Sequence, residues 1–297
     1  MEFTKAHGTA NDFVVLTDLD DRVELSDVLV RALADRRRGV GGDGVIRIGP
    51  GGDEADVFMD YRNADGSIGE MCGNGVRVVA KHVVDHGLVS PASDGTVRVG
   101  TRAGSKPVRV ATRHADGTVA SVTVDMGPPL LAPADVPFVT DDPDALRHPV
   151  TLGDELIHLG VVSMGNPHGV LVVDDVDVAP VTTLGPRLER DGRFPQGANI
   201  GFAQPLDAGA IRLRVWERGV GETAACGTGA CAAVVALQRL ALVGDEVAVR
   251  LPGGTLTVHH TAGATVLMTG PATEVARGVV DAAWLEAARR GEMESRS

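Results

Sequence analysis

A four-residue motif occurs twice in this chain and constrains its fold more than any other feature. Cys72-Gly73-Asn74-Gly75 opens one apolar segment, and Cys226-Gly227-Thr228-Gly229 opens another. The two cysteines lie 154 positions apart (226 minus 72), which is about the length of one domain. The chain has 297 residues, enough for about two such domains. The repeat therefore predicts two similar domains, each with a thiol at the start of a helix.

Short apolar runs with turn residues between them surround each motif. Residues 3–16 predict a strand, a polar loop over His7–Phe13 and a second strand. Further strands are predicted at Val45–Ile48, Val57–Tyr61, Thr96–Val99, Val108–Thr112, Val119–Met126, Ile157–Met164, Val170–Val173, Ile211–Trp216, Glu246–Leu251, Thr255–His259 and Thr265–Thr269. Many strands around one apolar helix in each half favour an α+β fold over the βαβ alternation of a parallel sheet.

Helices are predicted where capping residues precede apolar positions at helical spacing. Ser26 is a good N-cap for a helix that ends in Arg36–Arg38. The second motif continues into Ala230–Leu237, which is apolar on every side and therefore predicts a helix buried all round. Asp281–Arg290 predicts a last helix, and we expect the polar tail Glu292–Ser297 to be mobile.

A proline-rich stretch marks the predicted domain boundary. Residues 127–150 contain six prolines, a composition typical of connections between domains. We therefore expect one domain over 1–127 and a second over 128–270. The segment 271–297 is expected to pack back on the first domain.

Composition excludes several classes of partner. The net charge of -12 argues against binding to nucleic acid or to an anionic membrane surface, because both require basic patches. No apolar run approaches the roughly 18–20 residues that span a bilayer, and the first residues lack the pattern of a signal peptide. We therefore expect a cytoplasmic protein. Three cysteines are too few for a disulfide framework, so the thiols are either buried and inert or chemically used.

The position of the two motif cysteines suits proton transfer. A helix N-terminus presents unpaired N–H groups and partial positive charge, which lowers a thiol pKa from about 8.5 toward neutrality and also binds carboxylates. Two thiols on opposite faces of one α-carbon can invert it, because one removes the α-proton as thiolate while the other donates as thiol. A racemase or epimerase needs this symmetry, since its substrate and product differ only in hand.

Other interpretations of these residues are weaker. Cys231 lies inside the apolar helix and is best explained as a small buried hydrophobe. A metal site would need closely spaced ligands, whereas Cys226 and Cys231 lack Cys-x-x-Cys spacing, and His82 and His86 have no matching pair in the sequence. The glycine-rich segment 39–44 lacks the Gly-Lys-Ser/Thr ending of a phosphate loop. We therefore expect no metal.

With these motifs the sequence resembles the diaminopimelate epimerase family, the pyridoxal-independent epimerases of bacterial lysine and cell-wall synthesis. The matching segments run over nearly the whole chain. They are His7–Phe13, Asn63–Gly66, Cys72–Arg77, Gly165–His168, Ala198–Phe202, Glu217–Gly219, Gly221–Thr223 and Ala225–Cys231.

The resemblance implies two similar domains, each a barrel-like set of mostly antiparallel strands around a central helix, with the active site in the interdomain cleft. It implies interconversion of LL- and meso-2,6-diaminoheptanedioate, with Cys72 and Cys226 as the acid–base thiols and His168 and Glu217 in support. Substrate binding is implied for the side chains of Asn11, Asn63, Asn166, Asn199, Glu217 and Arg218, and for the backbone of Gly73, Asn74, Gly227 and Thr228. The implied enzyme has no cofactor, takes a small-molecule substrate and is a homodimer.

The sequence departs from the family pattern at a few positions. Thr9-Ala10 stands where the family often has Leu-Gly before Asn11, and Gly44 stands where many members carry a substrate-contacting glutamine. Ala276 replaces an aromatic residue that some members use in dimer contacts, and the chain extends past the usual family end. The first two departures bear on substrate affinity, and the third bears on the dimer interface.

Three alternative functions remain open on the sequence. A proline or hydroxyproline racemase would share the cysteine pair, although the four asparagines with Glu217 and Arg218 favour a longer, doubly zwitterionic substrate. A non-catalytic amino-acid-binding protein would leave the thiols inert. A pyridoxal enzyme fits poorly, because Lys81 is the only lysine near a motif and lies on the helix rather than at its mouth.

Overall fold

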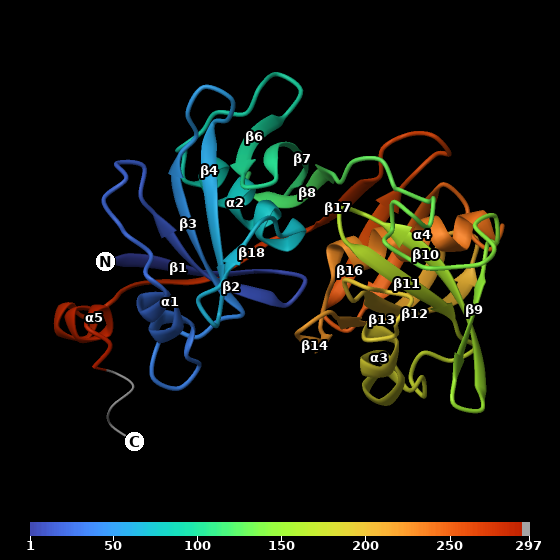
Figure 1. The fold of residues 1–297 in the computed structure, drawn as a ribbon. Coiled ribbons are helices and arrows are strands. Elements are labelled where there is room, and N and C mark those ends of the chain that lie inside the picture. Colours follow the sequence, from blue (N-terminus) through green and yellow to red (C-terminus); the bar gives the residue numbers. More distant parts are fainter. Residues whose placement is uncertain (293–297) are drawn as a thin grey trace. The chain divides into compact units, whose positions relative to one another are not determined.

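The computed structural model describes residues 1–292, so all but the first residue of the expected mobile tail, Glu292–Ser297, lies outside the described residues. The chain divides into two compact units, each of which is visible in Figure 1. Unit 1 comprises Met1–Val124 and the described residues from Gly270 onward, and unit 2 comprises Asp125–Thr269. Among the described residues, no helix combines the length and apolar character needed to span a bilayer.

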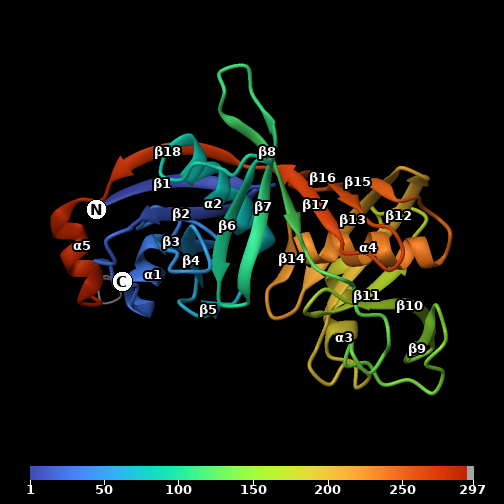
Figure 2. The same ribbon diagram turned by 90° about the horizontal axis from the view of Figure 1, so that it is seen from above.

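Unit 1 is a mixed sheet with three helices. Its elements are β1 (Glu2–Gly8), β2 (Asn11–Thr17), α1 (Asp27–Ala34), β3 (Gly44–Pro50), β4 (Val57–Asn63), β5 (Ile68–Gly69), α2 (Gly73–Asp85), β6 (Thr96–Thr101), β7 (Gly104–Arg113), β8 (Val119–Asp125), β18 (Thr273–Val279) and α5 (Ala282–Arg289). The strands pair in the order β18-β1-β2-β3-β4-β6-β7-β8, and β5 adds to β4. The C-terminal strand β18 thus lies beside the N-terminal strand β1, as Figure 2 shows.

Unit 2 repeats this arrangement with two helices. Its elements are β9 (His148–Leu152), β10 (Glu155–Ser163), β11 (Pro167–Val172), α3 (Val181–Glu189), β12 (Asn199–Asp207), β13 (Ala210–Glu217), β14 (Gly221–Thr223), α4 (Gly227–Arg239), β15 (Glu246–Leu251), β16 (Gly254–His259) and β17 (Leu267–Pro271). The pairing order is β9-β10-β11-β12-β13-β15-β16-β17, and β14 adds to β13.

The two units share one strand order, although β18 comes from the C-terminal part of the chain and its counterpart β9 directly precedes β10. In each, two pairs are parallel (β2–β3 and β4–β6 in unit 1, β11–β12 and β13–β15 in unit 2), and the other pairs are antiparallel. Each parallel pair is joined by a crossover that contains a helix. Helix α1 connects β2 to β3 and α2 connects β4 to β6, and α3 and α4 lie at the corresponding places in unit 2. The predicted α+β fold of two similar, mostly antiparallel domains is confirmed.

A buried helix lies at the centre of each unit. Every residue of α2 from Gly73 to Val83 is buried, and α2 packs against β1, β4, β6, β7 and β18. In α4 every residue from Gly227 to Leu237 is buried except Thr228, with strands β10, β11, β12, β13, β15 and β16 around it. The prediction of a helix buried on every side is therefore confirmed for α4. Alanine, valine and glycine dominate both helices, and their small volume lets strands approach closely.

The predicted end of the first helix and the predicted length of the loop before Phe13 were wrong. Helix α1 begins after the Ser26 N-cap as predicted, but it ends at Ala34 rather than in Arg36–Arg38. Asp35 leaves the helical conformation, and its Oδ1 accepts hydrogen bonds from the backbone N–H groups of Arg37 and Arg38, both at 2.8 Å. The predicted polar loop before Phe13 is also shorter, because β1 and β2 pair up to Gly8 and Asn11.

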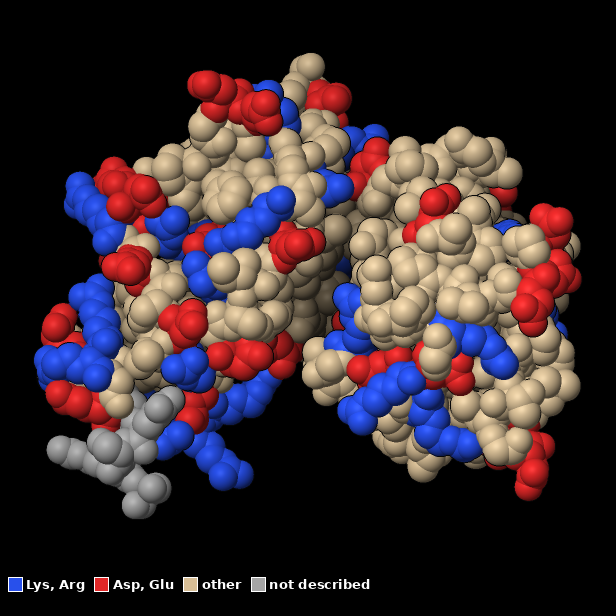
Figure 3. All heavy atoms as spheres, in the orientation of Figure 1, with Lys and Arg blue, Asp and Glu red and all other residues tan. Residues whose placement is uncertain are grey.

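Basic and acidic side chains are mixed on the surface of both units. On the face drawn in Figure 3, Lys and Arg side chains of the described residues lie among Asp and Glu side chains on both units. This interspersed pattern differs from the continuous basic surface that a nucleic acid needs.

The all-round burial of α4 predicts that its apolar side chains dominate the stability of unit 2. Leu237 has no exposed surface, so Leu237→Ala should lower the free energy of unfolding by about 2–5 kcal/mol. Leu206→Ala is the matched control, because Leu206 is 41% exposed, and its effect should stay below about 1 kcal/mol. Urea unfolding followed by circular dichroism measures both. Equal effects of the two substitutions would contradict a core role for α4.

Candidate functional site

In unit 1 the candidate site is built around the thiol that caps α2. Cys72 has extended backbone angles (φ −139°, ψ 113°), and its Sγ accepts a hydrogen bond from the Gly75 N–H at 3.5 Å. The thiol also lies 3.6 Å from Asn11 Oδ1, and Asn74 Nδ2 donates to the same oxygen at 3.3 Å. The structure thus brings three sequence-predicted residues, Cys72, Asn11 and Asn74, into direct contact.

A charged network behind Asn11 holds it in place. Asn11 Nδ2 donates to Asp43 Oδ2 at 2.9 Å, and Arg36 binds both Asp43 and Asp12 at 2.6–2.7 Å. Burial raises the pKa of Asp12, but the hydrogen bonds from Arg36 and Lys5 outweigh it and hold that pKa well below its usual range. Asp12 is therefore charged at neutral pH. The sequence analysis did not identify Asp12, Asp43 or Arg36, because nothing in a turn sequence shows which charges will meet.

Asn63 lies at the end of β4, next to the same network. The backbone N–H of Ala64 donates to Asp43 O at 3.1 Å, and Asn63 pairs with Gly44 across the β3–β4 ladder. A Cβ built on Gly44 would lie 2.5 Å from Arg62 O and 2.7 Å from the Tyr61 ring. This explains the Gly44 departure, because the ring of Tyr61 occupies the space that a larger residue at position 44 would need.

In unit 2 the second thiol caps α4 in the same way. Cys226 has extended backbone angles (φ −122°, ψ 113°), and its Sγ accepts from the Gly229 N–H at 3.4 Å. Thr228 Oγ1 lies 3.5 Å from the sulfur. The first-turn N–H groups of each helix, including those of Gly73 and Gly227, have no intrahelical acceptor and can face an anion.

The electrostatic setting of Cys226 differs from the sequence expectation. Burial raises the pKa of the Cys226 thiol well above its usual value, and the nearby Glu217 carboxylate raises it further. The hydrogen bonds from Thr228 and from the Gly229 N–H lower the pKa but do not compensate. The expected lowering toward neutrality is therefore wrong for Cys226, because desolvation and a like charge outweigh the helix N-terminus. This thiol is protonated at neutral pH.

Glu217 and Arg218 follow each other at the end of β13. Thr223 Oγ1 donates to Glu217 Oε1 at 2.5 Å, which aims the carboxylate from the neighbouring strand β14. The Arg218 N–H donates to Asn199 Oδ1 at 2.9 Å, and its guanidinium donates to Gln196 O at 2.9 Å. Asn199 Nδ2 donates to Pro167 O at 3.3 Å. Residues from four predicted motifs thus meet in one part of unit 2.

His168 is buried in unit 2, with 1% of its surface exposed, and pairs with Asn199 across β11 and β12. Its Nε2 lies 3.0 Å from Asn166 Oδ1, an acceptor, so Nε2 carries a proton and donates. Burial lowers the pKa of His168 to about 3, and the charge of Arg218 adds to this effect. The imidazole is therefore neutral at physiological pH.

Three side chains, His82 and His86 at the C-terminal end of α2 and Glu274 on β18, form a cluster that the sequence analysis did not anticipate. Glu274 Oε1 lies 2.7 Å from His82 Nδ1 and 3.1 Å from His86 Nε2, and Arg277 binds Oε2 at 2.8 Å. These three ligand-type residues lie within the reach of one metal ion. Their separations are those of hydrogen bonds, and Arg277 competes for the carboxylate. The cluster fastens the C-terminal half of α2 to β18.

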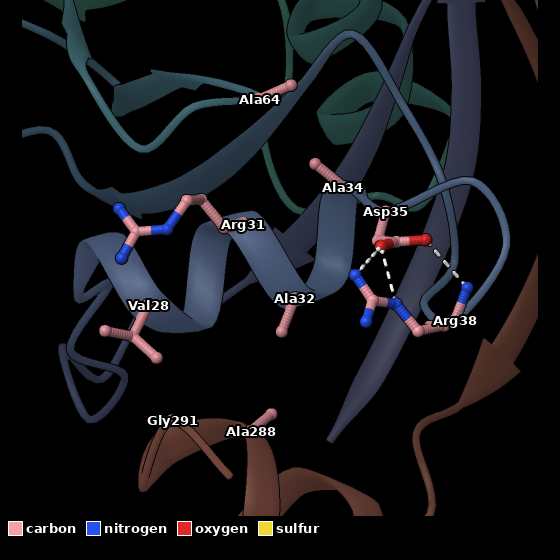
Figure 4. A pocket seen from close by; sticks show the side chains of 9 residues that line it. All are labelled: Val28, Arg31, Ala32, Ala34, Asp35, Arg38, Ala64, Ala288 and Gly291. Carbon is pink, nitrogen blue, oxygen red and sulfur yellow. Dashed lines mark hydrogen bonds and ion pairs between the residues drawn. The ribbon is translucent and has the colours of Figure 1, made fainter. Parts of the chain in front are cut away.

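A pocket in the described part of unit 1 includes Ala64, the neighbour of Asn63, in its lining. Figure 4 shows the lining side chains of this pocket, which come mainly from α1 and the segment around α5. The pocket has a volume of about 300 Å³. Its lining includes Val28, Arg31, Ala32 and Ala288, and none of the predicted site residues.

The sequence is similar to known proteins over nearly its whole length. The sequence model described as diaminopimelate epimerase matches residues 3–132 and 160–275. The chain is 47% identical over 285 residues to the diaminopimelate epimerase of Thioalkalivibrio sulfidiphilus, covering 95% of this chain and 99% of the relative. It is also 46% identical over 282 residues to that of Pseudomonas aeruginosa (strain UCBPP-PA14), covering 94% and 99%.

Solved structures with lower sequence similarity share the fold. A probable proline racemase from Agrobacterium radiobacter matches with a TM-score of 0.68 at 18% identity, covering 95% of this chain and 93% of that chain. A hydroxyproline epimerase from Agrobacterium vitis matches with a TM-score of 0.65 at 18% identity, covering 97% and 98%. At this identity the likeness concerns the fold alone.

The charge of Glu217 predicts the reactivity of Cys226. In a background with Cys72→Ser and Cys231→Ser, only Cys226 reacts with iodoacetamide. Glu217→Gln removes a like charge, so it should lower the pKa of Cys226 and raise the alkylation rate at pH 8 by about tenfold, the effect of a shift of one pKa unit. The rate-against-pH curve should move to lower pH. Glu222→Gln is the control, because Glu222 instead pairs with Arg214, and the rate should not change.

Proposed function

Because the chain belongs to the diaminopimelate epimerase family, we propose that it is a cofactor-independent epimerase that interconverts LL- and meso-2,6-diaminoheptanedioate. One observation carries the proposal. Two helices at corresponding places in two units of the same strand order each begin with a thiol that accepts a backbone N–H from the first turn of its own helix. An inversion needs two such groups, one for each face of the α-carbon.

The proposed reaction moves one proton on each side of the α-carbon. One sulfur, as thiolate, removes the α-proton, and the electron pair of the C–H bond passes into the adjacent carboxylate. The other sulfur, as thiol, donates its proton to the opposite face. After turnover the protonation states of Cys72 and Cys226 are exchanged, so the same pair catalyses the reverse direction.

The raised pKa of Cys226 supports a defined resting state. At neutral pH Cys226 holds its proton, so it is the donor in the direction that begins with Cys72 as thiolate. Where the reverse direction starts from this resting state, Cys226 must first lose that proton. The nearby Glu217 carboxylate is the candidate acceptor, and Thr223 keeps it aimed. In this scheme His168 takes part as a neutral imidazole, because its pKa of about 3 excludes the charged form.

Substrate binding is proposed for two sets of groups. The N–H groups of the first helical turns, at Gly73, Asn74, Gly227 and Thr228, would hold the carboxylate on the reacting carbon, where charge develops. The distal end of the substrate is itself an amino acid. Arg218 suits its carboxylate, Glu217 suits an ammonium, and the amides of Asn11, Asn63, Asn166 and Asn199 can both donate and accept.

We also propose the setting in which the enzyme works. Its product would serve lysine and peptidoglycan precursor synthesis in the cytoplasm, and the enzyme would act as a homodimer. Ala276 is exposed on β18, so any contact there would differ from the aromatic contact of some relatives. A proline or hydroxyproline racemase shares the fold, but the identity to its solved structures is low, and the polar residues above favour a longer substrate.

The two-base scheme predicts the outcome of an isotope experiment. Reduced protein with LL-diaminopimelate in D₂O, without added cofactor, should lose the α-proton NMR signal while the meso isomer accumulates. Cys72→Ala and Cys226→Ala should each lower the epimerisation rate by at least about 10³-fold, because each removes a proton-transfer group. Cys231→Ala is the control and should retain activity, since Cys231 is a buried core residue.

Two results would contradict this scheme. Near-normal epimerisation by either single variant at a motif cysteine would exclude the two-thiol mechanism. Exchange with proline but not with diaminopimelate would exclude the substrate and favour the proline racemase alternative. A protein that binds diaminopimelate without exchange would be the non-catalytic binding protein.

A further inference from the structure

A chain of hydrogen bonds around Asn63 in unit 1 has a fixed direction. The Tyr61 hydroxyl donates to Asn63 Oδ1 at 2.7 Å, and Asn63 Nδ2 donates to Ser67 Oγ at 2.9 Å. The backbone N–H of Ser67 donates to Asp65 Oδ1 at 2.8 Å. All four residues belong to the end of β4 and the turn into β5.

The direction is set by the carboxylate at one end. An ionised carboxylate can only accept hydrogen bonds. The pKa of Asp65 is lowered, first by the hydrogen bond from the Ser67 side chain and then by the one from its N–H. The single hydroxyl proton of Ser67 is therefore committed to Asp65, so Ser67 Oγ accepts from Asn63. The amide nitrogen of Asn63 must face Ser67, and its oxygen must face Tyr61.

Packing fixes the position of Tyr61, at the other end of this chain of hydrogen bonds. The Tyr61 ring lies in a slot between two glycines, because a Cβ on Gly69 would lie 2.2 Å from ring atom Cδ1 and one on Gly44 would lie 2.7 Å from Cε2. Phe13 packs edge-on against the ring, with the centroids 5.8 Å apart. Any side chain at position 44 or 69 would displace the ring. The hydroxyl of Tyr61 is thus held on Asn63 by rigid neighbours.

This arrangement leaves one N–H of Asn63 available. Its Nδ2 carries two protons, and Ser67 takes one, while the second has no acceptor among the described residues. The side chain of Asn63 is partly exposed, so this N–H can reach a ligand. In the opposite orientation, the amide would present an oxygen lone pair and repel a carboxylate.

We propose that Tyr61 and Ser67 are positioning residues, which orient the Asn63 amide so that it donates to a carboxylate of the substrate. This inference rests on the proposed function, which gives Asn63 a carboxylate-bearing ligand. It adds the two side chains that decide whether Asn63 offers a donor or an acceptor.

Kinetics of Tyr61→Phe test the proposal, since phenylalanine keeps the ring in its slot and removes only the hydroxyl. The contact is made in both the ground state and the transition state, so KM for diaminopimelate should rise about fivefold, the equivalent of one hydrogen bond, and kcat should stay within about twofold. Ser67→Ala should act in the same way. Ser121→Ala is the matched control, because it removes a hydroxyl that pairs with Thr112 at 2.6 Å, away from Asn63, and KM should not change.

A double-mutant cycle separates positioning from general support of the fold. In an Asn63→Ala background, Tyr61→Phe should cause no further rise in KM, because the amide it orients is absent. A structural role would raise KM in both backgrounds or lower kcat and the melting temperature together. Either of those results would overturn the proposal.

Measuring α-proton exchange by the wild-type protein separates a failure of the positioning proposal from a failure of the proposed epimerase function. If the wild type exchanges the α-proton and Tyr61→Phe leaves KM unchanged, the positioning proposal fails while the epimerase function stands. If the wild type shows no exchange, the proposed function fails. Calorimetric titration with diaminopimelate then decides the positioning. A fivefold weaker dissociation constant for Tyr61→Phe would support it, and equal constants or no binding would overturn it.

Discussion

The contact between a helix N-terminus and a thiol is the interaction on which both units depend. Sulfur is a weak acceptor, and Ser, Thr, Asp or Asn would cap a helix better than Cys72 or Cys226. The N–H···S distances of 3.5 and 3.4 Å show that each thiol nevertheless serves as the cap. The stability that the weak cap does not supply comes from burial, because the strands of each unit surround α2 and α4. A reactive group can therefore stand where a capping residue is expected.

The two capping cysteines have similar backbone conformations but different surroundings. Cys72 is partly exposed and touches the neutral amide of Asn11, whereas Cys226 is 5% exposed and faces the charged Glu217. In a buried site a nearby negative charge disfavours a thiolate, while an amide leaves the net charge unchanged. Repetition of the fold thus supplies two equivalent positions, and local side chains make the two thiols unequal. In the proposed scheme this inequality makes Cys226 the thiol of the resting state.

The sequence predicted the thiol caps, the buried helix α4 and most strands, because these features depend on residues that are adjacent or periodic. It did not predict α3, although Leu184 and Leu188 have helical spacing. Pro186 cannot donate the backbone hydrogen bond of a helix interior, and the burial of Val181, Leu184 and Leu188 in the core of unit 2 offsets that loss. Strands β9, β12 and β18 were missed, and β9 begins inside the proline-rich stretch 127–150 that was interpreted as a domain boundary. The contacts of Asn63 with Tyr61 and Ser67 depend on register and on amide orientation, which composition and spacing do not encode.

The Thr9-Ala10 departure shows how strain and a buried charge are combined near Asn11. Thr9 and Ala10 have φ of 53° and 62°, the left-handed region that normally favours glycine and disfavours each of them by about 1 kcal/mol. The turn places the Thr9 hydroxyl 2.6 Å from Arg77, a guanidinium with no exposed surface that also binds Asn74 Oδ1. A leucine at position 9 would offer Arg77 no acceptor. The strain is therefore offset by satisfying a buried donor, and the same turn fixes the position of Asn11 beside Cys72.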